Sequence, residues 1–497
     1  MGITGFIFLS SGLFLGWSLG AQDASNVFGT AVATRMVRFK TAALVCSVCL
    51  MLGAVISGVG AADTLGDLGH VNAIGGSFVT AFAAAFTASV MSRIGLTISV
   101  SQAVVGSIIG WNWFSGSVTD TDSLMKMAGT WVACPILGGI FAVILFIVFA
   151  RLADKAQLSL LKRDALTRTA MVVTGAFGSY ALGANNMANV VGVFIPVAPF
   201  KDFNFFGFEI TAIQQLFFIG SAAVAVGVYT YSYKVMMTVG KGLMPLSPFA
   251  AWVVVLSQAC VLFIFASEGL EHFLASRGLP TIPLVPVSST QAVVGAVIGI
   301  GLYKGAAKNI NWNILLKVMS GWIISPVVTA CFCFFSLFIM QNVFSQPVFT
   351  PKEYRITAPG LQEIGRRGFP AEKLEPMIGK TYTSGQAVVR AAKEYVPDLT
   401  NQQELRILKY SEVVKMKIDP SKMKKLPENV FSEEEIKNIQ ALSEQSFEHR
   451  WELENALTAL NPAWRHLPAT TLNKQANKKL MRQLELLERT FKWESPV

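Results

Sequence analysis

Two polar segments lie inside otherwise apolar stretches of the sequence, and both carry side-chain oxygen atoms. The first is Gly20–Gly29 (GAQDASNVFG) and the second is Gly183–Gly192 (GANNMANVVG). Asp23 is the only Asp or Glu in the long apolar stretches and the two polar segments that continue them, and an ionisable side chain in such a stretch indicates a functional site. The oxygen-bearing side chains of the two segments are Gln22, Asp23, Asn26, Asn185, Asn186 and Asn189.

Carboxylate and amide oxygens together suit a hard cation. We therefore expect the two segments to form a cation site, with proton uptake by Asp23 as the alternative chemistry. A purely structural polar network between packed helices is the remaining alternative.

A second pair of segments combines hydroxyls and a glutamine with a following apolar run. These are SVSQAVVG at Ser99–Gly106 and SSTQAVVG at Ser288–Gly295. Their polar residues can cap short helices, whose free N–H groups form an anion site. Two such sites would surround a tetrahedral oxyanion, although N-capping alone would also explain the hydroxyls. The candidate anion ligands are Ser99, Ser101, Gln102, Ser288, Ser289, Thr290 and Gln291.

The predicted anion site has no basic side chain to balance a buried negative charge. No Lys or Arg lies near the middle of the apolar runs, and an oxyanion cannot be held away from water without compensation. We therefore expect cations to accompany the anion.

The composition is that of a membrane protein that crosses the bilayer several times. The chain has 497 residues, of which 52% are hydrophobic and 14% are charged, whereas soluble domains have about 25% charged residues. Residues 1–346 hold 11 acidic and 17 basic residues, and residues 347–497 hold 20 and 24. The membrane part therefore ends near Gln346, and a soluble part follows.

Apolar runs long enough to cross the bilayer fall into two sets. Between the third and fourth runs of each set lies a shorter apolar piece, near 99–114 and 284–302, which suggests broken or re-entrant helices. The long runs are 3–19, 40–60, 72–92, 124–150, 165–182, 211–231, 247–267 and 314–340.

Charged residues between the runs set the expected orientation. Arg35, Arg38 and Lys40 follow the first run, whereas Asp63 and Asp67 occupy the next loop. Basic loops are typically cytoplasmic, which places the N-terminus outside the cytoplasm and the C-terminal domain on the non-cytoplasmic side. The same bias explains the net charge of +10, so we expect the lipid bilayer, and no nucleic acid, as a partner.

The two sets of runs repeat one another. Both motif pairs recur in the same order, and Trp131 and Pro135 correspond to Trp322 and Pro326. Four long runs and one short piece give each set an odd number of crossings, so the two halves are inverted in the membrane. Inverted repeats are an architecture typical of secondary transporters. The predicted domains are repeat 1 over 1–160, repeat 2 over 161–346 and a soluble helical domain over 347–497.

The polar C-terminal part is expected to form a small helical domain. The segment from Ser432 to Glu435 (SEEE) is a capping box and predicts a helix reaching about Leu460. Further helices are predicted near 384–395, 401–417 and 470–492. The complete fold class is thus an all-α polytopic membrane protein with two inverted repeats and a C-terminal helical domain.

With these motifs, residues 5–340 resemble the inorganic phosphate transporter (PiT-type) family of secondary transporters. That family carries a G-A-N-D-x-A-N-A-x-G-like motif and a P-x-S-T-T-H-x-x-V-G-like motif in each half. The resemblance implies cation-coupled phosphate uptake, with the hydroxyl motifs serving the anion. It assigns the coupling cation, sodium if the transporter is sodium-coupled, to Asp23, Asn26, Asn186 and Asn189.

This sequence departs from the family motifs at several positions. Gln22 replaces an Asn, Asn186 replaces the second Asp, and Gln102 and Gln291 replace two His. Thr97 also stands where the first hydroxyl motif of the family has Pro. The loss of one carboxylate removes a fixed negative charge, and the loss of His removes groups that titrate near neutrality. The stoichiometry and the choice between sodium and proton therefore stay open.

The expected function is symport of inorganic phosphate with sodium or protons across the plasma (inner) membrane by alternating access. We expect no other cofactor and no enzymatic activity, because the membrane part shows no nucleophile–base pair or metal-ligand spacing. The alternatives are transport of sulfate or another tetrahedral oxyanion, and an anion sensor that signals through the C-terminal domain. Large transporters of this kind are often homodimers, and the sequence itself leaves the oligomeric state open.

Overall fold

The computed structural model divides the chain into two compact units. Unit 1 comprises Met1–Ser115, Thr119–Glu271 and Ile282–Thr350, and unit 2 comprises Gly116–Val118, His272–Thr281 and Pro351–Val497. The structure describes residues 3–94, 98–157, 159–198, 200, 202–205, 208–239, 246–306, 308, 310–366, 369–427, 430–468 and 470–493.

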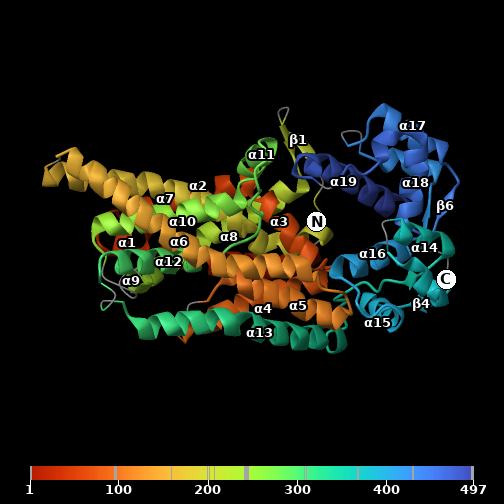
Figure 1. Ribbon diagram of the computed structural model, residues 1–497, viewed down its shortest axis with the longest axis horizontal. Coiled ribbons are helices and arrows are strands. Elements are labelled where there is room, and N and C mark those ends of the chain that lie inside the picture. The colour runs from red at the N-terminus through yellow and green to blue at the C-terminus, as the bar shows by residue number, and fades with distance from the viewer. Residues whose placement is uncertain are drawn as a thin grey trace. The chain divides into compact units, whose positions relative to one another are not determined.

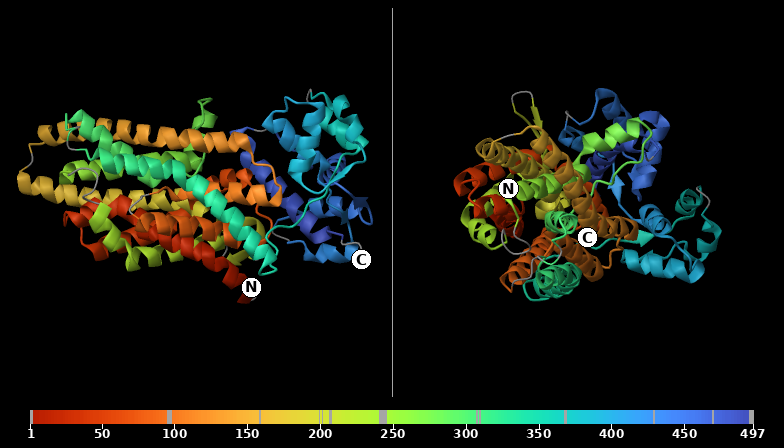
Figure 2. Two further views of the ribbon diagram at one scale, coloured as in Figure 1. Left: turned by 90° about the horizontal axis from the view of Figure 1, so that it is seen from below. Right: turned by 60° about the vertical axis from the view of Figure 1, so that its left-hand side comes forward.

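Unit 1 is a bundle of long helices that run side by side (Figures 1 and 2). One short hairpin, β1 (Phe203–Phe205) with β2 (Phe208–Ile210), interrupts the helical pattern. The helices are α1 (Ile3–Ala33), α2 (Phe39–Ser57), α3 (Val59–Leu68), α4 (Ile74–Arg93), α5 (Val100–Ser115), α6 (Thr121–Lys155), α7 (Leu160–Val191), η1 (Gly192–Val197), α8 (Ala212–Thr230), α9 (Ser232–Val239), α10 (Pro248–Ala266), α11 (Glu268–Ser276), α12 (Ser289–Tyr303) and α13 (Trp312–Asn342). The residues of α11 from His272 onward are assigned to unit 2.

Six of the described helices are long and apolar enough to cross a membrane, namely α2, α4, α6, α8, α10 and α13. The fold class of a helical polytopic membrane protein is thereby confirmed. The other two predicted runs correspond to α1 and α7, which are 31 and 32 residues long. The short apolar pieces form α5 and α12, of 16 and 15 residues.

The two polar segments lie within continuous helices. The apolar runs end at residues 19 and 182, but α1 continues to Ala33 and α7 to Val191. Polar side chains are accommodated in a membrane helix when they face the protein interior. Asp23 and Asn186 are both buried, so the helices need not break at the segments.

Local sequence signals explain where several helices begin. The Asp120 carboxylate accepts from the backbone N–H groups of Asp122 and Ser123 at the start of α6. Thr211 and Gln214 form a capping box at α8, and Ser247 caps α10 with Pro248 at its first position. Each cap satisfies N–H groups that have no partner within the helix.

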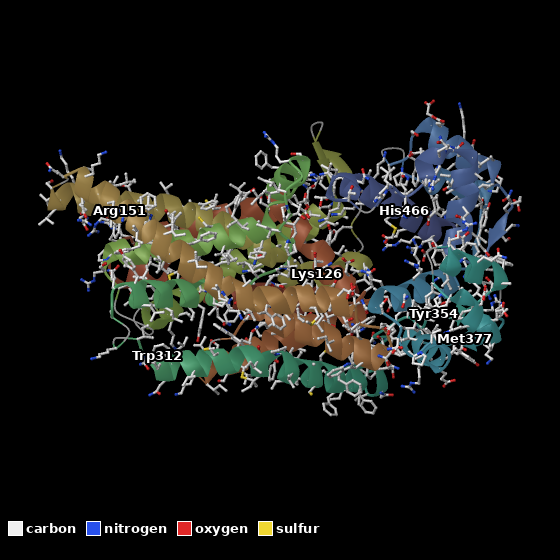
Figure 3. All side chains as sticks on the ribbon, in the orientation of Figure 1. Lys126, Arg151, Trp312, Tyr354, Met377 and His466 are labelled. Carbon is white, nitrogen blue, oxygen red and sulfur yellow. The ribbon has the colours of Figure 1, made fainter. Side chains whose placement is uncertain are left out.

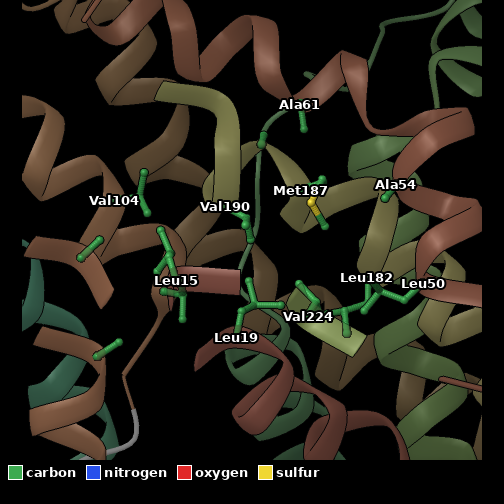
Figure 4. Packing of buried hydrophobic residues seen from close by; sticks show 14 of the residues in the cluster. Leu15, Leu19, Leu50, Ala54, Ala61, Val104, Leu182, Met187, Val190 and Val224 are labelled. Carbon is green, nitrogen blue, oxygen red and sulfur yellow. The ribbon is translucent and has the colours of Figure 1, made fainter. Parts of the chain in front are cut away.

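Helices from the two halves of the sequence pack against each other in exchanged pairs. Helix α1 packs against α8, and α2 packs against α7. A Cβ at Gly20 would lie 2.0 Å from the carbonyl oxygen of Val224, and one at Gly183 would lie 2.0 Å from that of Leu50. Figure 4 shows the side chains at these contacts, with Leu19 beside Val224 and Leu182 beside Leu50. The glycines therefore permit close approach of the helix backbones.

The two short helices also pack against helices from the other half of the sequence. Helix α5 packs against α13, and α12 packs against α6. A Cβ at Gly106 would lie 2.2 Å from the carbonyl oxygen of Pro326, and one at Gly295 would lie 1.9 Å from that of Pro135. The matched Pro residues and the matched Gly residues of the sequence repeat thus contact one another across the two halves.

The side-chain view shows the direction of the two Pro-containing helices. Lys126 lies near one end of α6 and Arg151 near its other end, and Trp312, which opens α13, lies toward the end of unit 1 where Arg151 is found (Figure 3). Helix α6 therefore ends at the same end of unit 1 at which α13 begins, and the two helices run in opposite directions.

Unit 2 is helical with short two-residue strands. Its two apolar cores are formed by residues between Tyr354 and Ile407 and between Met416 and Phe491. Its elements are β3 (Tyr354–Arg355), α14 (Ala358–Gly365), η3 (Ala371–Met377), β4 (Thr381–Tyr382), α15 (Gly385–Tyr395), α16 (Asn401–Ser411), β5 (Met416–Lys417), η4 (Pro420–Lys425), α17 (Glu433–Ala441), β6 (Ser446–Phe447), α18 (Arg450–Leu460), η5 (Pro462–Trp464), η6 (Thr471–Asn473) and α19 (Lys474–Phe491).

Two predicted helices of unit 2 differ from the structure. The helix expected from Ser432 to about Leu460 is divided into α17 and α18, because Glu444 adopts a positive φ of 66°, which a helix cannot contain. The helix expected over 401–417 ends at Ser411. Met416 and Lys417 instead pair with Phe447 and Ser446 as an antiparallel ladder.

The two halves of unit 2 repeat one pattern. In each half a short strand, a helical segment, a second strand and a further helix follow in order. Gly379 and Glu444 both have positive φ, and their N–H groups donate to the carbonyl oxygens of Ile356 and Ile418, respectively. The strands β3 and β4 pair as β5 and β6 do. Unit 2 is therefore built from two similar modules.

Candidate functional site

Asp23 lies at the centre of a hydrogen-bonded cluster that joins four helices, α1, α5, α7 and α12. The side chains of Asp23 and Asn26 are three residues apart and share one face of α1. Asn26 donates to the Asp23 carboxylate at 3.3 Å, and Asn186 of α7 donates to its other oxygen at 3.1 Å. Asp23 is 7% exposed. Amide groups from two different helices therefore satisfy the buried carboxylate.

Asn26 also connects the carboxylate to the start of α12. Its amide nitrogen donates to the Ser289 hydroxyl at 2.9 Å and to the Thr290 hydroxyl at 3.2 Å. The predicted cation residues of the first segment and the predicted anion residues of the second half therefore lie in direct contact. The Asn26 amide thus links Asp23 to both hydroxyls.

The three asparagines of α7 form the other half of the cluster. Asn185 and Asn189 donate to the amide oxygen of Asn186 at 2.9 and 3.2 Å. Asn189 also donates to the Ser101 hydroxyl of α5 at 2.8 Å. The network therefore continues from Asp23 through Asn186 and Asn189 to the first turn of α5.

The two short helices begin in matching ways. The Ser99 hydroxyl accepts from the Gln102 N–H at 3.4 Å, and the Ser288 hydroxyl accepts from the Gln291 N–H at 3.3 Å. All four side chains are buried. The structure thus brings the first turns of α5 and α12 to the same polar cluster, through Ser101 and through Ser289 and Thr290.

A backbone segment before α12 completes the cluster. Asn185 donates to the Val287 carbonyl oxygen at 2.7 Å and accepts from the Val287 N–H at 3.1 Å. This double hydrogen bond holds the chain that enters α12 against α7. Val287 is absent from the predicted site residues, because an apolar side chain gives no signal of a backbone contact.

Gln22 stands apart from the other predicted cation residues. Its amide donates to the Ser18 hydroxyl one turn back on α1 at 3.2 Å. Gln22 lies four residues before Asn26 and so shares its side of α1, but the Gln22 amide hydrogen-bonds to Ser18 and, within the described residues, to no side chain of the cluster. Gln22 is therefore not part of the hydrogen-bonded cluster.

The cluster contains one acidic side chain and no basic one. Among the described residues of unit 1, Asp23 is the only buried Asp, Glu, Lys or Arg. Its neighbours are amides and hydroxyls, which can donate or accept hydrogen bonds. The site can therefore bind an anion only if positive charge enters with it.

Several buried amide oxygens near the cluster accept no hydrogen bond within the described residues. They include Oε1 of Gln102, Oε1 of Gln291 and Oδ1 of Asn189. A buried acceptor without a partner costs about 1–3 kcal/mol. These oxygens are available to a bound cation or to a hydrogen-bond donor.

Comparison with known proteins identifies the family. A model of the phosphate transporter family matches residues 19–271 and 279–459 of the chain. The chain belongs to the phosphate transporter family. The match extends into unit 2, beyond the residues 5–340 that the motifs cover.

Several archaeal relatives of this phosphate transporter family member are similar over most of their length. The protein named "putative phosphate permease" from Pyrococcus furiosus is 25% identical over 389 residues, covering 63% of this chain and 90% of the relative. A protein of the same name from Methanocaldococcus jannaschii is 26% identical over 318 residues, covering 63% of this chain and 91% of the relative. Membership of this permease family confirms the prediction that the protein is a transporter and not an enzyme.

A solved structure described as "The sodium-dependent phosphate transporter" shares the fold. It matches with a TM-score of 0.54 and 20% identity, covering 69% of this chain and 100% of the other. At this identity the likeness concerns the fold alone. It agrees with the helical membrane architecture of unit 1.

Proposed function

We propose that the protein imports inorganic phosphate together with sodium across the plasma membrane by alternating access. The observation that carries this proposal is the position of Asp23. Its buried carboxylate contacts α7 directly and reaches α12 through Asn26. The proposed cation site and the proposed anion site are therefore parts of one hydrogen-bonded cluster.

Charge compensation explains why the two ions must move together. The hydroxyls of Ser101, Ser289 and Thr290, with the N–H groups that open α5 and α12, supply neutral donors to phosphate. Asp23 adds a negative charge nearby, which opposes binding of an anion alone. Sodium bound at Asp23 removes this repulsion, so each ion favours binding of the other.

The amide groups must turn when sodium binds. Asn26 and Asn186 present their N–H groups to Asp23, an arrangement that satisfies the carboxylate without a cation. Rotation about the last side-chain bond exchanges amide nitrogen and oxygen, and places two further oxygens beside the carboxylate. Hard cations such as sodium bind to oxygen ligands of this kind.

The structural neighbour supports sodium over protons, because that protein is described as sodium-dependent. The basic loops support an N-terminus outside the cytoplasm, with unit 2 on the non-cytoplasmic side. The sodium ligands in this proposal are Asp23, Asn26, Asn186 and Asn189, and the anion ligands are Ser99, Ser101, Gln102, Ser288, Ser289, Thr290 and Gln291.

Uptake of labelled phosphate into proteoliposomes under separately imposed sodium and proton gradients tests the proposal. We expect an inward sodium gradient to accelerate uptake at least tenfold, and a proton gradient without sodium to leave it near the passive rate. Uptake driven by protons alone would overturn sodium coupling. Uptake of labelled sulfate, with none of phosphate, would overturn the substrate.

A further inference from the structure

Gln258 is a buried amide that lies outside the sequence motifs. It lies on α10, is 1% exposed, and neither its amide nitrogen nor its amide oxygen has a hydrogen-bond partner among the described residues. Burial of an unpartnered amide costs several kcal/mol in an apolar environment, of order 2–7. Because its burial has this cost, Gln258 is a candidate for a ligand-binding residue.

Contacts of the neighbouring residue place Gln258 at the level of the site. The Ser257 hydroxyl donates to the Gly138 carbonyl oxygen of α6 at 2.7 Å. A Cβ at Gly138 would lie 2.4 Å from the carbonyl oxygen of Ala292, one turn into α12. Gln258 therefore lies level with the first turn of α12, where the candidate anion ligands are found.

The helix geometry directs Gln258 toward the interior of unit 1. Ser257 faces α6, to which its hydroxyl donates. Ala259 faces α7, because a Cβ built at Gly178 of α7 would lie 3.5 Å from the Ala259 Cβ. Leu256 and Cys260 are only partly buried, so the opposite face of α10 points outward. With about 100° between successive residues, Gln258 points inward, where α10 also packs against α1 and α12.

The chemistry of the cluster indicates what Gln258 would bind. The amide oxygens of Gln258, Gln102 and Gln291 are all buried acceptors without a donor in the described residues. A fully deprotonated oxyanion offers only acceptors and would leave these oxygens unpaired. Phosphate keeps at least one P–OH group at neutral pH, whereas sulfate has none. Phosphate alone of the two can both accept from an amide N–H and donate to an amide oxygen.

We propose that Gln258 is a further phosphate-binding residue, whose amide oxygen accepts a hydrogen bond from the protonated phosphate oxygen and thereby selects phosphate over sulfate. This inference rests on the proposed function and adds a determinant of specificity to it. A site that binds a hydroxyl group discriminates strongly against an analogue without one, because its buried polar groups are then left unpaired.

Two variants of the full-length protein test the role of Gln258. Gln258→Met keeps the volume and removes both polar atoms, and Gln258→Glu keeps acceptors at this position. Labelled phosphate uptake is measured in proteoliposomes against unlabelled phosphate, arsenate and sulfate. Arsenate carries As–OH groups as phosphate carries P–OH groups, so it should compete with phosphate in the wild type, and sulfate should not.

We expect Gln258→Met to weaken phosphate competition at least tenfold and to reduce the preference for phosphate over sulfate by the same factor. Gln258→Glu should retain that preference while its added charge weakens phosphate uptake. Gln22→Met is the matched control, because Gln22 bonds to Ser18 outside the cluster, and it should behave as the wild type does.

Wild-type selectivity in Gln258→Met, or an equal loss of selectivity in both variants, would overturn the inference. Thermal unfolding of each variant in detergent establishes that the protein is folded, and Gln258→Glu decides the matter if Gln258→Met does not fold. Absence of phosphate uptake by the wild type would instead contradict the proposed function itself.

Discussion

At the scale of single residues, the position of one carboxylate determines what the site can do. Asp23 is satisfied by amide N–H groups from two helices, and no buried Lys or Arg accompanies it among the described residues of unit 1. A buried carboxylate held only by neutral donors attracts a cation strongly. Neutral hydroxyls and helix N-termini then provide the anion with donors but no charge.

Asn26→Ala is expected to reduce phosphate uptake at least tenfold. The substitution removes the donor shared by Asp23, Ser289 and Thr290, and hydrogen bonds to charged groups contribute about 1.5–3 kcal/mol each. Gln22→Ala, four residues earlier on the same helix, is the control and should change uptake less than twofold. Initial rates of labelled phosphate uptake compare the variants, and equal losses in both would show that the cluster has no special role.

Asn186→Asp is expected to make uptake more steeply dependent on sodium concentration. The new carboxylate would lie beside Asp23, because the Asn186 amide is 3.1 Å from it, and two adjacent carboxylates repel each other unless a cation lies between them. Titration of uptake against sodium at constant ionic strength measures the steepness. An unchanged sodium dependence would argue against a cation at this position.

At the scale of helices, close backbone contacts hold the two halves of unit 1 together. The polar segments contribute Gly20 and Gly183, each within contact distance of a carbonyl oxygen on a helix from the other half. Interfaces of this kind in membranes depend on small residues, because the lipid gives no hydrophobic driving force between helices. The segments therefore combine a packing role with the polar site.

Gly183→Ala is expected to destabilise the protein by about 1–3 kcal/mol, the usual cost of overpacking. A Cβ there would lie 2.0 Å from the Leu50 carbonyl oxygen, whereas a Cβ at Gly192 would meet only a Leu65 methyl at 3.4 Å. Gly192→Ala is thus the matched control, and should leave stability nearly unchanged. Thermal unfolding in detergent measures both, and equal stability of the two variants would contradict the packing argument.

Elements with a periodic or repeated signal could be predicted from the sequence. The apolar runs correspond to helices, and the repeated hydroxyl motifs open α5 and α12. The linear motif places Gln22 with the cation residues, but its amide hydrogen-bonds to Ser18, and a motif does not show which side chains bond to one another. Gln258 and Val287 carried no motif, since their roles arise only when α10 and the chain before α12 pack against other helices.

Unit 2 shows the limits of local signals in another way. The capping box at Ser432 correctly starts α17, but the sequence beyond it keeps helix-forming residues through the turn at Glu444. Pairing of β6 with the distant β5 overrides this local preference. Tertiary contacts of this kind cannot be deduced from propensity alone.

At the scale of the whole molecule, the candidate site lies entirely within unit 1. The chain after α13 still contributes to unit 1, because the Val348 carbonyl accepts from Trp111 at 3.0 Å and Thr350 exchanges hydrogen bonds with Asn72. Unit 2 has its own apolar cores. Within the described residues, the hydrogen-bonded cluster therefore contains no residue of unit 2.

A variant that ends after Thr350 is expected to retain phosphate uptake within about threefold of the full chain. Every predicted site residue and the contacts of Val348 and Thr350 remain in it. Uptake is compared at equal amounts of folded protein in the membrane. Complete loss of uptake by folded protein would favour the alternative in which unit 2 signals anion binding or controls transport.

Coupling of phosphate to a cation through Asp23 is tested most directly by the response of Asp23→Asn to sodium. Labelled phosphate uptake is measured in proteoliposomes with and without an inward sodium gradient, for the wild type and for Asp23→Asn. We predict at least tenfold acceleration by sodium in the wild type and none in Asp23→Asn. Sodium-driven uptake at the wild-type rate in Asp23→Asn would contradict the coupling role of this carboxylate.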